Sequence, residues 1–356
     1  MKTTWKNILF CVSAIIFGIG LNVSAAEERP VLSMGDYEYS LLEDGTAEII
    51  HYNGTDADLE VPEEMDGAVV TSIGKGAFAH CGSLRSLVLP DGITSIGEKA
   101  FSKCKSLTNL TLPDSITSIG RNPLLGCSSM EQIKVSVDNP TLAVIDGLLY
   151  FKPEKRLVYC PLDKAIVEIP RGIQSIGASA FSGCVRLSSI LLPDSLLNIG
   201  KSAFENCTGL SSIILPDSVT SIGEAAFSGC ESLSSITLPA GLTSLEYYAF
   251  SHCKSLVVVS LPDGLTSIGE AAFSGCESLS CITLPESLTS IGKQAFSGCE
   301  SLSSITLPAG VTNIGDDALY GCEGLIITVS RDSYAAQYCE ENGLNYMYTD
   351  SLDWLN

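Results

Sequence analysis

Apolar and polar positions recur along this chain with a fixed period of 23 residues. The stretch TSIGEAAFSGCESLSSITLP at 220–239 returns at 266–285 with a single change, Ser235 against Cys281. The same spacing separates one apolar residue of each repeat: Ile73, Ile96, Ile119, then Ile176, Ile199, Ile222, Leu245, Ile268, Ile291 and Ile314. A short period sustained over most of a chain predicts a solenoid, in which stacked coils bury one another's apolar side chains.

One repeat shows which elements the pattern predicts. Residues 235–238 read Ser-Ile-Thr-Leu, and this alternation predicts a short strand with one buried face, which Pro239 ends. A second short extended segment is expected at 242–245, and Ala249-Phe250 is expected in a compact helical turn. The residue that closes this turn should be left-handed, because it is usually glycine or asparagine: Gly183, Asn206, Gly229, Gly275, Gly298 and Gly321.

Stacking should place equivalent residues in columns that form buried ladders. The aromatic column contains Phe78, Phe101, Phe181, Phe204, Phe227, Phe250, Phe273 and Phe296. The cysteine column contains Cys81, Cys104, Cys127, Cys184, Cys207, Cys230, Cys253, Cys276, Cys299 and Cys322. Stacked side chains point in parallel, whereas a disulfide needs them to converge, so a reduced ladder is favoured over serial disulfides. The spacing also excludes a zinc knuckle.

Three segments depart from the period. The step from Ile119 to Ile176 is 57 residues, which indicates an insertion at about 136–170, and LLYFKPEKRLVYC (148–160) predicts a hairpin within it. A hairpin is also expected at 37–54, and an amphipathic helix at 332–342. The predicted organisation is an N-terminal cap over 26–58, a solenoid over 59–330 and a C-terminal cap over 331–356, because an open solenoid end exposes apolar surface.

The first 25 residues have the pattern of a signal peptide. Lys2 and Lys6 precede an apolar run at 8–21, and Val23-Ser24-Ala25 has the small-x-small form of a cleavage site. The run is shorter than a membrane-spanning helix requires, although an uncleaved anchor is the alternative. With neither a lipobox nor a sortase motif in evidence, we expect cleavage after Ala25 and export to the cell surface or the medium.

The spacing Cys-x-x-Leu-x-x-Ile-x-Leu-Pro-x-x-Leu-x-x-Ile resembles the leucine-rich repeat of the bacterial BspA-like type, over about residues 59–330. The resemblance implies an α/β repeat fold, a curved right-handed solenoid of short strands and short helical turns. It also implies a protein exported to the bacterial surface or beyond, in a family associated with adhesion to host proteins and cells.

Composition removes several classes of function. The formal net charge is −21 and no basic cluster is evident, which argues against nucleic acid as a partner. Of three histidines, His80 and His252 occupy turn positions many coils apart and cannot meet. An acidic column could collect calcium, but Ala240 and Ala309 interrupt it: Asp91, Asp114, Asp194, Asp217, Asp263 and Glu286. We expect no catalytic residue, metal or cofactor.

What remains is a surface formed by the outward residues of each strand. Its candidate binding residues are Leu191, Ile214, Thr237, Val258, Ser260, Thr283 and Thr306, although strand propensity alone could select such residues. The function favoured by the sequence is adhesion-type binding of a protein or glycan ligand. Host extracellular proteins are among the candidate ligands. The alternative is a self-associating structural surface protein without a specific ligand, and the sequence leaves the oligomeric state open. A hydrolase within 136–170 is disfavoured, because that segment contains no histidine.

Overall fold

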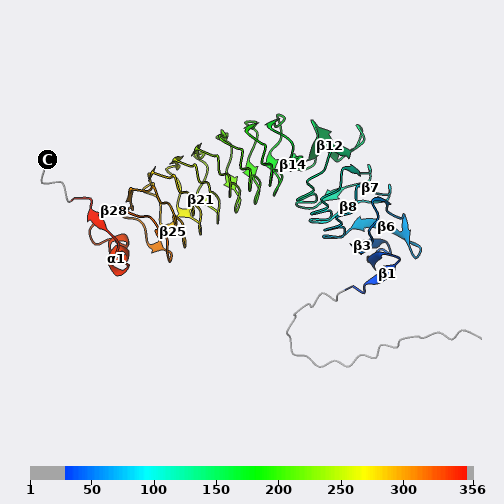
Figure 1. The fold of residues 1–356 in the computed structure, drawn as a ribbon, viewed down its shortest axis with the longest axis horizontal. Helices are drawn as coiled ribbons and strands as arrows, with labels where there is room; N and C mark the ends of the chain where they lie inside the picture. The colour runs from blue at the N-terminus through cyan, green and yellow to red at the C-terminus, as the bar shows by residue number, and fades with distance from the viewer. Residues whose placement is uncertain (1–28, 351–356) are drawn as a thin grey trace, which may run out of the picture.

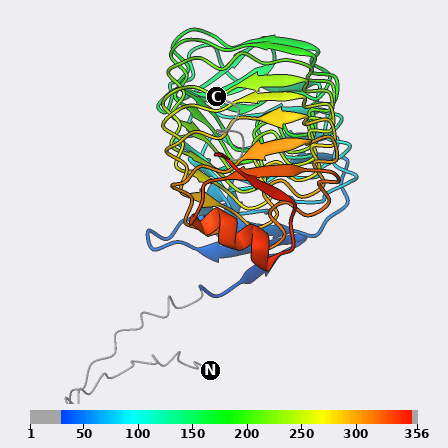
Figure 2. The same cartoon turned by 90° about the vertical axis from the view of Figure 1, so that its left-hand side faces the viewer.

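The computed structural model describes residues 29–350, so the expected signal peptide and the last six residues lie outside it. The coils follow one another along an arc (Figure 1), and strands of successive coils form nearly parallel rungs (Figure 2). A regular coil contributes a strand of three residues and a strand of two. Each pairs in register with the equivalent strand of the next coil, as Ile236 pairs with Val259 and Ser244 with Ser267. The sequence period therefore sets the register.

The N-terminal coils contribute two sheets. The first has the order β1-β2-β3-β6-β8-β10, with β5 beside β6: β1 (Leu32–Met34), β2 (Tyr37–Leu41), β3 (Ala47–Tyr52), β5 (Glu64–Met65), β6 (Ala68–Ile73), β8 (Ser95–Ile96) and β10 (Ser118–Ile119). The second has the order β11-β9-β7-β4: β4 (Asp58–Glu60), β7 (Ser86–Val88), β9 (Asn109–Thr111) and β11 (Gln132–Lys134).

The remaining coils contribute four sheets. One runs β12-β13-β14-β16-β18-β19: β12 (Leu142–Ile145), β13 (Leu148–Phe151), β14 (Arg156–Tyr159), β16 (Ser175–Ile176), β18 (Asn198–Ile199) and β19 (Ser221–Ile222). A parallel pair is formed by β15 (Ile166–Glu168) and β17 (Ser189–Leu191). Another runs through β20 (Ser235–Thr237), β22 (Val258–Ser260), β24 (Cys281–Ile282), β26 (Ser304–Thr306), β28 (Ile326–Val329) and β29 (Tyr346–Tyr348). The last comprises β21 (Ser244–Leu245), β23 (Ser267–Ile268), β25 (Ser290–Ile291) and β27 (Asn313–Ile314).

Antiparallel pairing occurs only away from the regular coils of the described region. β2 pairs antiparallel with β3, and β13 pairs antiparallel with both β12 and β14. The sequence pattern anticipated strands at β13 and β14 but not at β12, which the Asp146-Gly147 turn joins to β13. β5 and β6, joined by Asp66-Gly67, were also not anticipated.

The expected helical turn around Ala249-Phe250 is wrong in its detail, because the segment forms successive turns and no helix. Alternate N–H groups bond in two directions. Ala249 and Cys253 donate to carbonyls three residues back, whereas Tyr248, Phe250 and His252 donate to the next coil. Because every second N–H group of this segment donates to the next coil, too few N–H groups remain to form the hydrogen bonds of a helix. The left-handed closing residue is confirmed, with positive φ at Asn206 and at the glycines of that column.

On the C-terminal side of the insertion, the aromatic column forms a continuous stack in the buried core. From Phe181 to Phe296, successive ring centroids lie 5.0–5.6 Å apart and the planes deviate by 2–11°. Each of these rings is fully buried. Beside them, the thiols of eight of the ten column cysteines donate to the carbonyl of the phenylalanine in the preceding coil, as Cys230 does to Phe204 at 3.2 Å; Cys81 and Cys184 donate to other carbonyls. The cysteines therefore join neighbouring coils as well as filling space.

The buried core is divided into two clusters, and the insertion lies between them. Alternate side chains of β13 contribute to opposite clusters: Leu149 and Phe151 to the N-terminal core, Leu148 and Tyr150 to the C-terminal core. All four residues of this strand are buried. Because strand side chains alternate between faces, β13 is buried on both sides. The insertion is thus a partition between two stacks of coils.

A single helix is present in the described residues, α1 (Tyr334–Glu341), close to the predicted span. The Ser333 side chain caps it by accepting from the Ala336 N–H. Ala335, Ala336 and Cys339 are buried, and they pack into the core of the last coils. The helix therefore covers apolar surface at this end of the stack.

Candidate functional site

The outward side chains of β15, β17, β20, β22, β24 and β26, with residues 212–214 between β17 and β20, form the surface that we call the sheet face. All seven candidate residues are exposed on it: Leu191, Ile214, Thr237, Val258, Ser260, Thr283 and Thr306. The strand register aligns Thr237 with Ser260, and Val258 with Cys281. Most of this face consists of small hydroxyl side chains, so its few large apolar residues stand out.

Leu191 and Ile214 lie together in a shallow depression of about 370 Å³, bordered by Asp194 and Pro216. They are 61% and 86% exposed, respectively. Ile166, which is 75% exposed, lies on the neighbouring strand β15, where it pairs with Ser189 rather than with Leu191. Sequence reasoning did not include Ile166 among the binding residues, although residues 166–170 rejoin the strand-Pro pattern of the repeat. Leu191 and Ile214 are therefore the two large apolar side chains that line this depression with high exposure.

The strand pairing of the sheet face is interrupted beside this depression. Residues 211–216 belong to no strand, and separate sheets end at β17 and begin at β20. The two-residue strands of the same two coils, β19 and β21, are also not paired with each other, because one sheet ends at β19 and another begins at β21. There Glu246 occupies a slot that is glycine in the neighbouring coils (Gly223, Gly269). At Gly269 an added Cβ would lie 2.7 Å from the Leu245 carbonyl oxygen, so a side chain in this slot separates coils.

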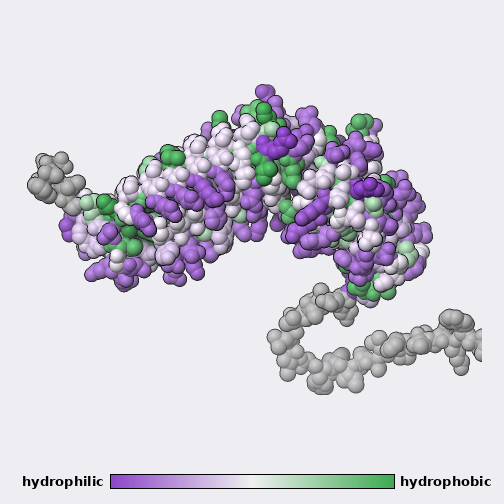
Figure 3. Space-filling view, in the orientation of Figure 1, coloured by the Kyte–Doolittle hydropathy of each residue, from purple (hydrophilic) through white to green (hydrophobic). Residues whose placement is uncertain are grey.

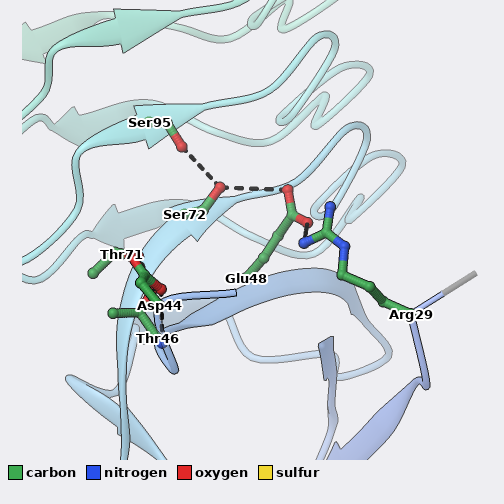
Figure 4. Close-up of polar contacts among 7 residues, drawn as sticks. All are labelled: Arg29, Asp44, Thr46, Glu48, Thr71, Ser72 and Ser95. Atoms are coloured by element: carbon green, nitrogen blue, oxygen red, sulfur yellow. Dashed lines mark hydrogen bonds and ion pairs between the residues drawn. The ribbon is translucent and has the colours of Figure 1, made fainter. Parts of the chain in front are cut away.

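A second surface lies along the two-residue strands, and we call it the hydroxyl column: Ser72, Ser95, Ser118, Arg156, Ser175, Asn198, Ser221, Ser244, Ser267, Ser290 and Asn313. Figure 4 shows its first members. Ser95 donates to Ser72 at 2.8 Å, and Ser72 contacts Glu48, which also pairs with Arg29. Arg156 enters this column through β14, whose register pairs it with Ser175, and it adds a positive charge there.

The histidines and the acidic column singled out from the sequence lie on the surface of the described residues. His80 and His252 are exposed turn residues with φ of 67° and 58°. The acidic column is exposed, and within residues 29–350 no three His, Cys, Asp or Glu side chains cluster in a way that could hold a metal ion. In the same range no helix has the length and apolar character required to cross a bilayer.

The thiols of the described chain are all free, and every one is buried except Cys281, which is exposed, and Cys322, which is half-buried. Burial raises the pKa of Cys230 and of Cys276 to about 12. These thiols therefore remain protonated at neutral pH, where they donate to backbone carbonyls and are poor nucleophiles. Cys281 lies on the sheet face, paired with Val258 and Ser304.

We expect an aromatic disulfide reagent to modify one described thiol rapidly in the folded protein, that of Cys281. Cys322 should react more slowly, because burial raises its pKa to about 11, and the other thiols should react only after unfolding. Absorbance of the released thiolate, with and without denaturant, measures both phases. Cys281→Ser should remove the rapid phase, whereas prompt reaction of several thiols would contradict the buried ladder.

These coils belong to a defined class of leucine-rich repeat. The sequence profile of the BspA type leucine rich repeat region matches residues 68–145, 155–276 and 222–334, which together span more than half of the chain. The chain therefore belongs to the family of proteins with BspA type leucine-rich repeats. Solenoids of this family are typically non-enzymatic and suited to protein binding.

Solved structures of bacterial leucine-rich repeat proteins resemble this one. A leucine rich cell surface protein from Faecalibacterium prausnitzii is 28% identical, with a TM-score of 0.54, and the match covers 92% of this chain and 97% of that chain. A leucine-rich repeat protein from Eubacterium ventriosum is 22% identical, with a TM-score of 0.49 and coverage of 74% and 93%. One from Bacteroides ovatus is 25% identical, with a TM-score of 0.38 and coverage of 89% and 99%. No curated protein matches the chain.

Proposed function

We propose that this protein is an exported, non-enzymatic leucine-rich repeat protein that binds a protein ligand at the cell surface through its sheet face. The observation that carries the proposal is the exposed pair of Leu191 and Ile214 in one depression, on a face otherwise rich in serine and threonine. Contiguous exposed apolar side chains mark interaction sites, and central apolar anchors dominate binding energy. The signal-like segment at 1–25 supports export.

The charges around the depression define the kind of ligand. Asp194 borders it, Asp217 is exposed in the next coil, and Glu168 pairs with Leu191 across β15 and β17, whereas Arg171 is the nearby cation. Acidic groups around an apolar centre favour a partner with basic residues flanking an apolar side chain. Serine and threonine along the rest of the face supply hydrogen bonds at the rim.

The ends of the solenoid have a different role in this proposal. Buried residues of β2 and β3 pack into the core of the first coils, and residues of α1 and β29 pack against the core of the last coils. We infer that both act as caps. By covering the apolar core of the end coils, they leave the lateral faces of the solenoid for recognition.

The double substitution Leu191→Ser/Ile214→Ser is expected to weaken ligand binding by at least about tenfold, since each side chain is a candidate anchor. Biosensor binding to a panel of extracellular matrix proteins, followed by titration of any hit, measures the loss. The matched control is Val137→Ser/Val185→Ser, which removes two exposed valines that lie off the sheet face.

Equal loss in both double variants would contradict recognition by the sheet face. Size-exclusion chromatography of the unliganded protein tests the structural alternative. Saturable binding by a monomer supports the proposal, and concentration-dependent polymers that bind no panel member would favour a self-associating surface protein instead.

A further inference from the structure

Positive charge is concentrated at the centre of this acidic molecule. Residues 99–201 carry 12 Lys and Arg against 8 Asp and Glu, a formal charge of +4. The rest of the chain carries −25, which gives the total of −21. This central segment contains the insertion and the coils on either side of it. In Figure 3 strongly hydrophilic side chains lie beside apolar ones in the middle of the arc. The charge distribution therefore sets the centre apart from both ends.

A groove of about 550 Å³ lies within this segment, along the hydroxyl column, and we call it the central groove. Its charged lining residues are Arg121, Arg156, Lys201 and Glu154, three cations against one carboxylate. Lys201 also pairs with Glu224 at 2.7 Å, and Glu224 is not part of the lining. The groove is a locally cationic site on a protein of opposite net charge, which focuses anions into it.

Arg156 is held in place before any ligand arrives. Its side chain is only 14% exposed, and its Nε donates to Glu154 at 2.6 Å. Its guanidinium also donates to the Ile119 carbonyl at 3.2 Å and lies over the Phe151 ring. The Ile119 carbonyl lies at the end of the sheet at β10, so Arg156 supplies a donor where the insertion interrupts the ladder. A fixed guanidinium binds oxyanions with little loss of side-chain entropy.

The groove is elongated and polar. Residues of β14, β16, β18 and β19, which are successive neighbours in one sheet, line it, so at about 4.8 Å per strand it extends roughly 14 Å. Ser175, Asn198 and Ser221 present hydroxyl and amide groups along it. Along the groove β14, β16 and β18 are each paired on both sides, so these strands offer no backbone edge for an extended peptide to join.

We propose that the central groove binds a linear anionic polysaccharide. Arg121, Arg156 and Lys201 contact its carboxylate or sulfate groups, and the hydroxyl column bonds to its hydroxyl groups. A hydroxyl-rich, regularly charged chain matches both the side chains and the length of the groove. This site is separate from the sheet face, so it would give the protein a second class of ligand.

Titration calorimetry with dextran sulfate, polygalacturonate and neutral dextran tests the proposal. We expect at least one anionic polymer to bind, binding to weaken as salt is raised, and dextran not to bind. Arg121→Ala/Lys201→Ala should weaken binding by at least about tenfold, because each removes a charge-assisted contact. Both residues are exposed, so the fold should persist, which circular dichroism checks.

Lys293→Ala is the matched control, since Lys293 follows Gly292 as Lys201 follows Gly200 but lies outside the central groove. It should change affinity by less than about twofold. Failure of both anionic polymers to bind, or equal loss in Lys293→Ala, would overturn the proposal, as would equally tight binding of polyglutamate. The Leu191→Ser/Ile214→Ser variant should bind the polysaccharide normally, which separates this site from the sheet face.

Discussion

Phe227→Ala is expected to lower the free energy of unfolding by about 3–5 kcal/mol, the range for large-to-alanine changes in a core that cannot collapse. The Phe227 ring is fully buried and lies 5.2 Å from the Phe204 ring and 5.3 Å from the Phe250 ring. Truncation leaves a cavity between two coils whose separation is fixed by backbone hydrogen bonds. Urea denaturation followed by circular dichroism measures the change.

The matched control for this variant is Tyr320→Ala. Tyr320 is an aromatic residue in the equivalent segment of a later coil, one residue after the phenylalanine position, and is 71% exposed, so its removal should change stability by less than about 0.5 kcal/mol. A loss below about 1 kcal/mol for Phe227→Ala would mean that the aromatic stack is not the core of the solenoid.

Gly292→Ala is expected to destabilise the protein by about 3 kcal/mol, at the upper end of the range for overpacking. A Cβ at this position would lie 2.5 Å from the Glu270 nitrogen and 2.5 Å from the Gly269 carbonyl carbon. Both atoms belong to the backbone of the preceding coil, which cannot rotate out of the way. Thermal and urea unfolding should both report the loss.

Gly310→Ala is the control, because its Cβ would meet its nearest neighbour, the Glu286 carbonyl oxygen, at 3.5 Å. This change should be neutral or should stabilise by about 0.4–1 kcal/mol, through the entropy of the unfolded chain. The position of Gly292 is glycine in the neighbouring repeats but glutamate at Glu246, and the strand pairing between β19 and β21 is missing at that coil. Equal effects of the two alanines would show that coil spacing does not depend on this column.

The repeat itself could be predicted from the sequence because its physics is local and periodic. Alternation at 235–238 predicts β20, and the 23-residue step predicts which residues face one another, so the order of Phe181 to Phe296 followed directly. The prediction of a helical turn was wrong because the conformation of this segment depends on hydrogen bonds to the next coil. Such bonds cannot be read from one repeat alone.

The sites were predictable to different degrees. Leu191 and Ile214 stand out in sequence because they replace serine or threonine in a regular column. Arg156 could not be placed, because its role depends on β14 entering the hydroxyl column and reaching the Ile119 carbonyl. The burial of β13 on both faces could not be predicted either, because it follows from the presence of coils on both sides of the insertion.

Amide hydrogen exchange at the phenylalanine column tests most directly whether each coil is stabilised by its neighbours. The N–H groups of Phe204, Phe227 and Phe250 lie in turns, yet they donate to Ala226, Ala249 and Ala272 of the next coil at 2.7–2.8 Å. The stacked arrangement predicts that these amides are among the slowest to exchange in the folded protein. Rapid exchange, as in ordinary surface turns, would contradict it.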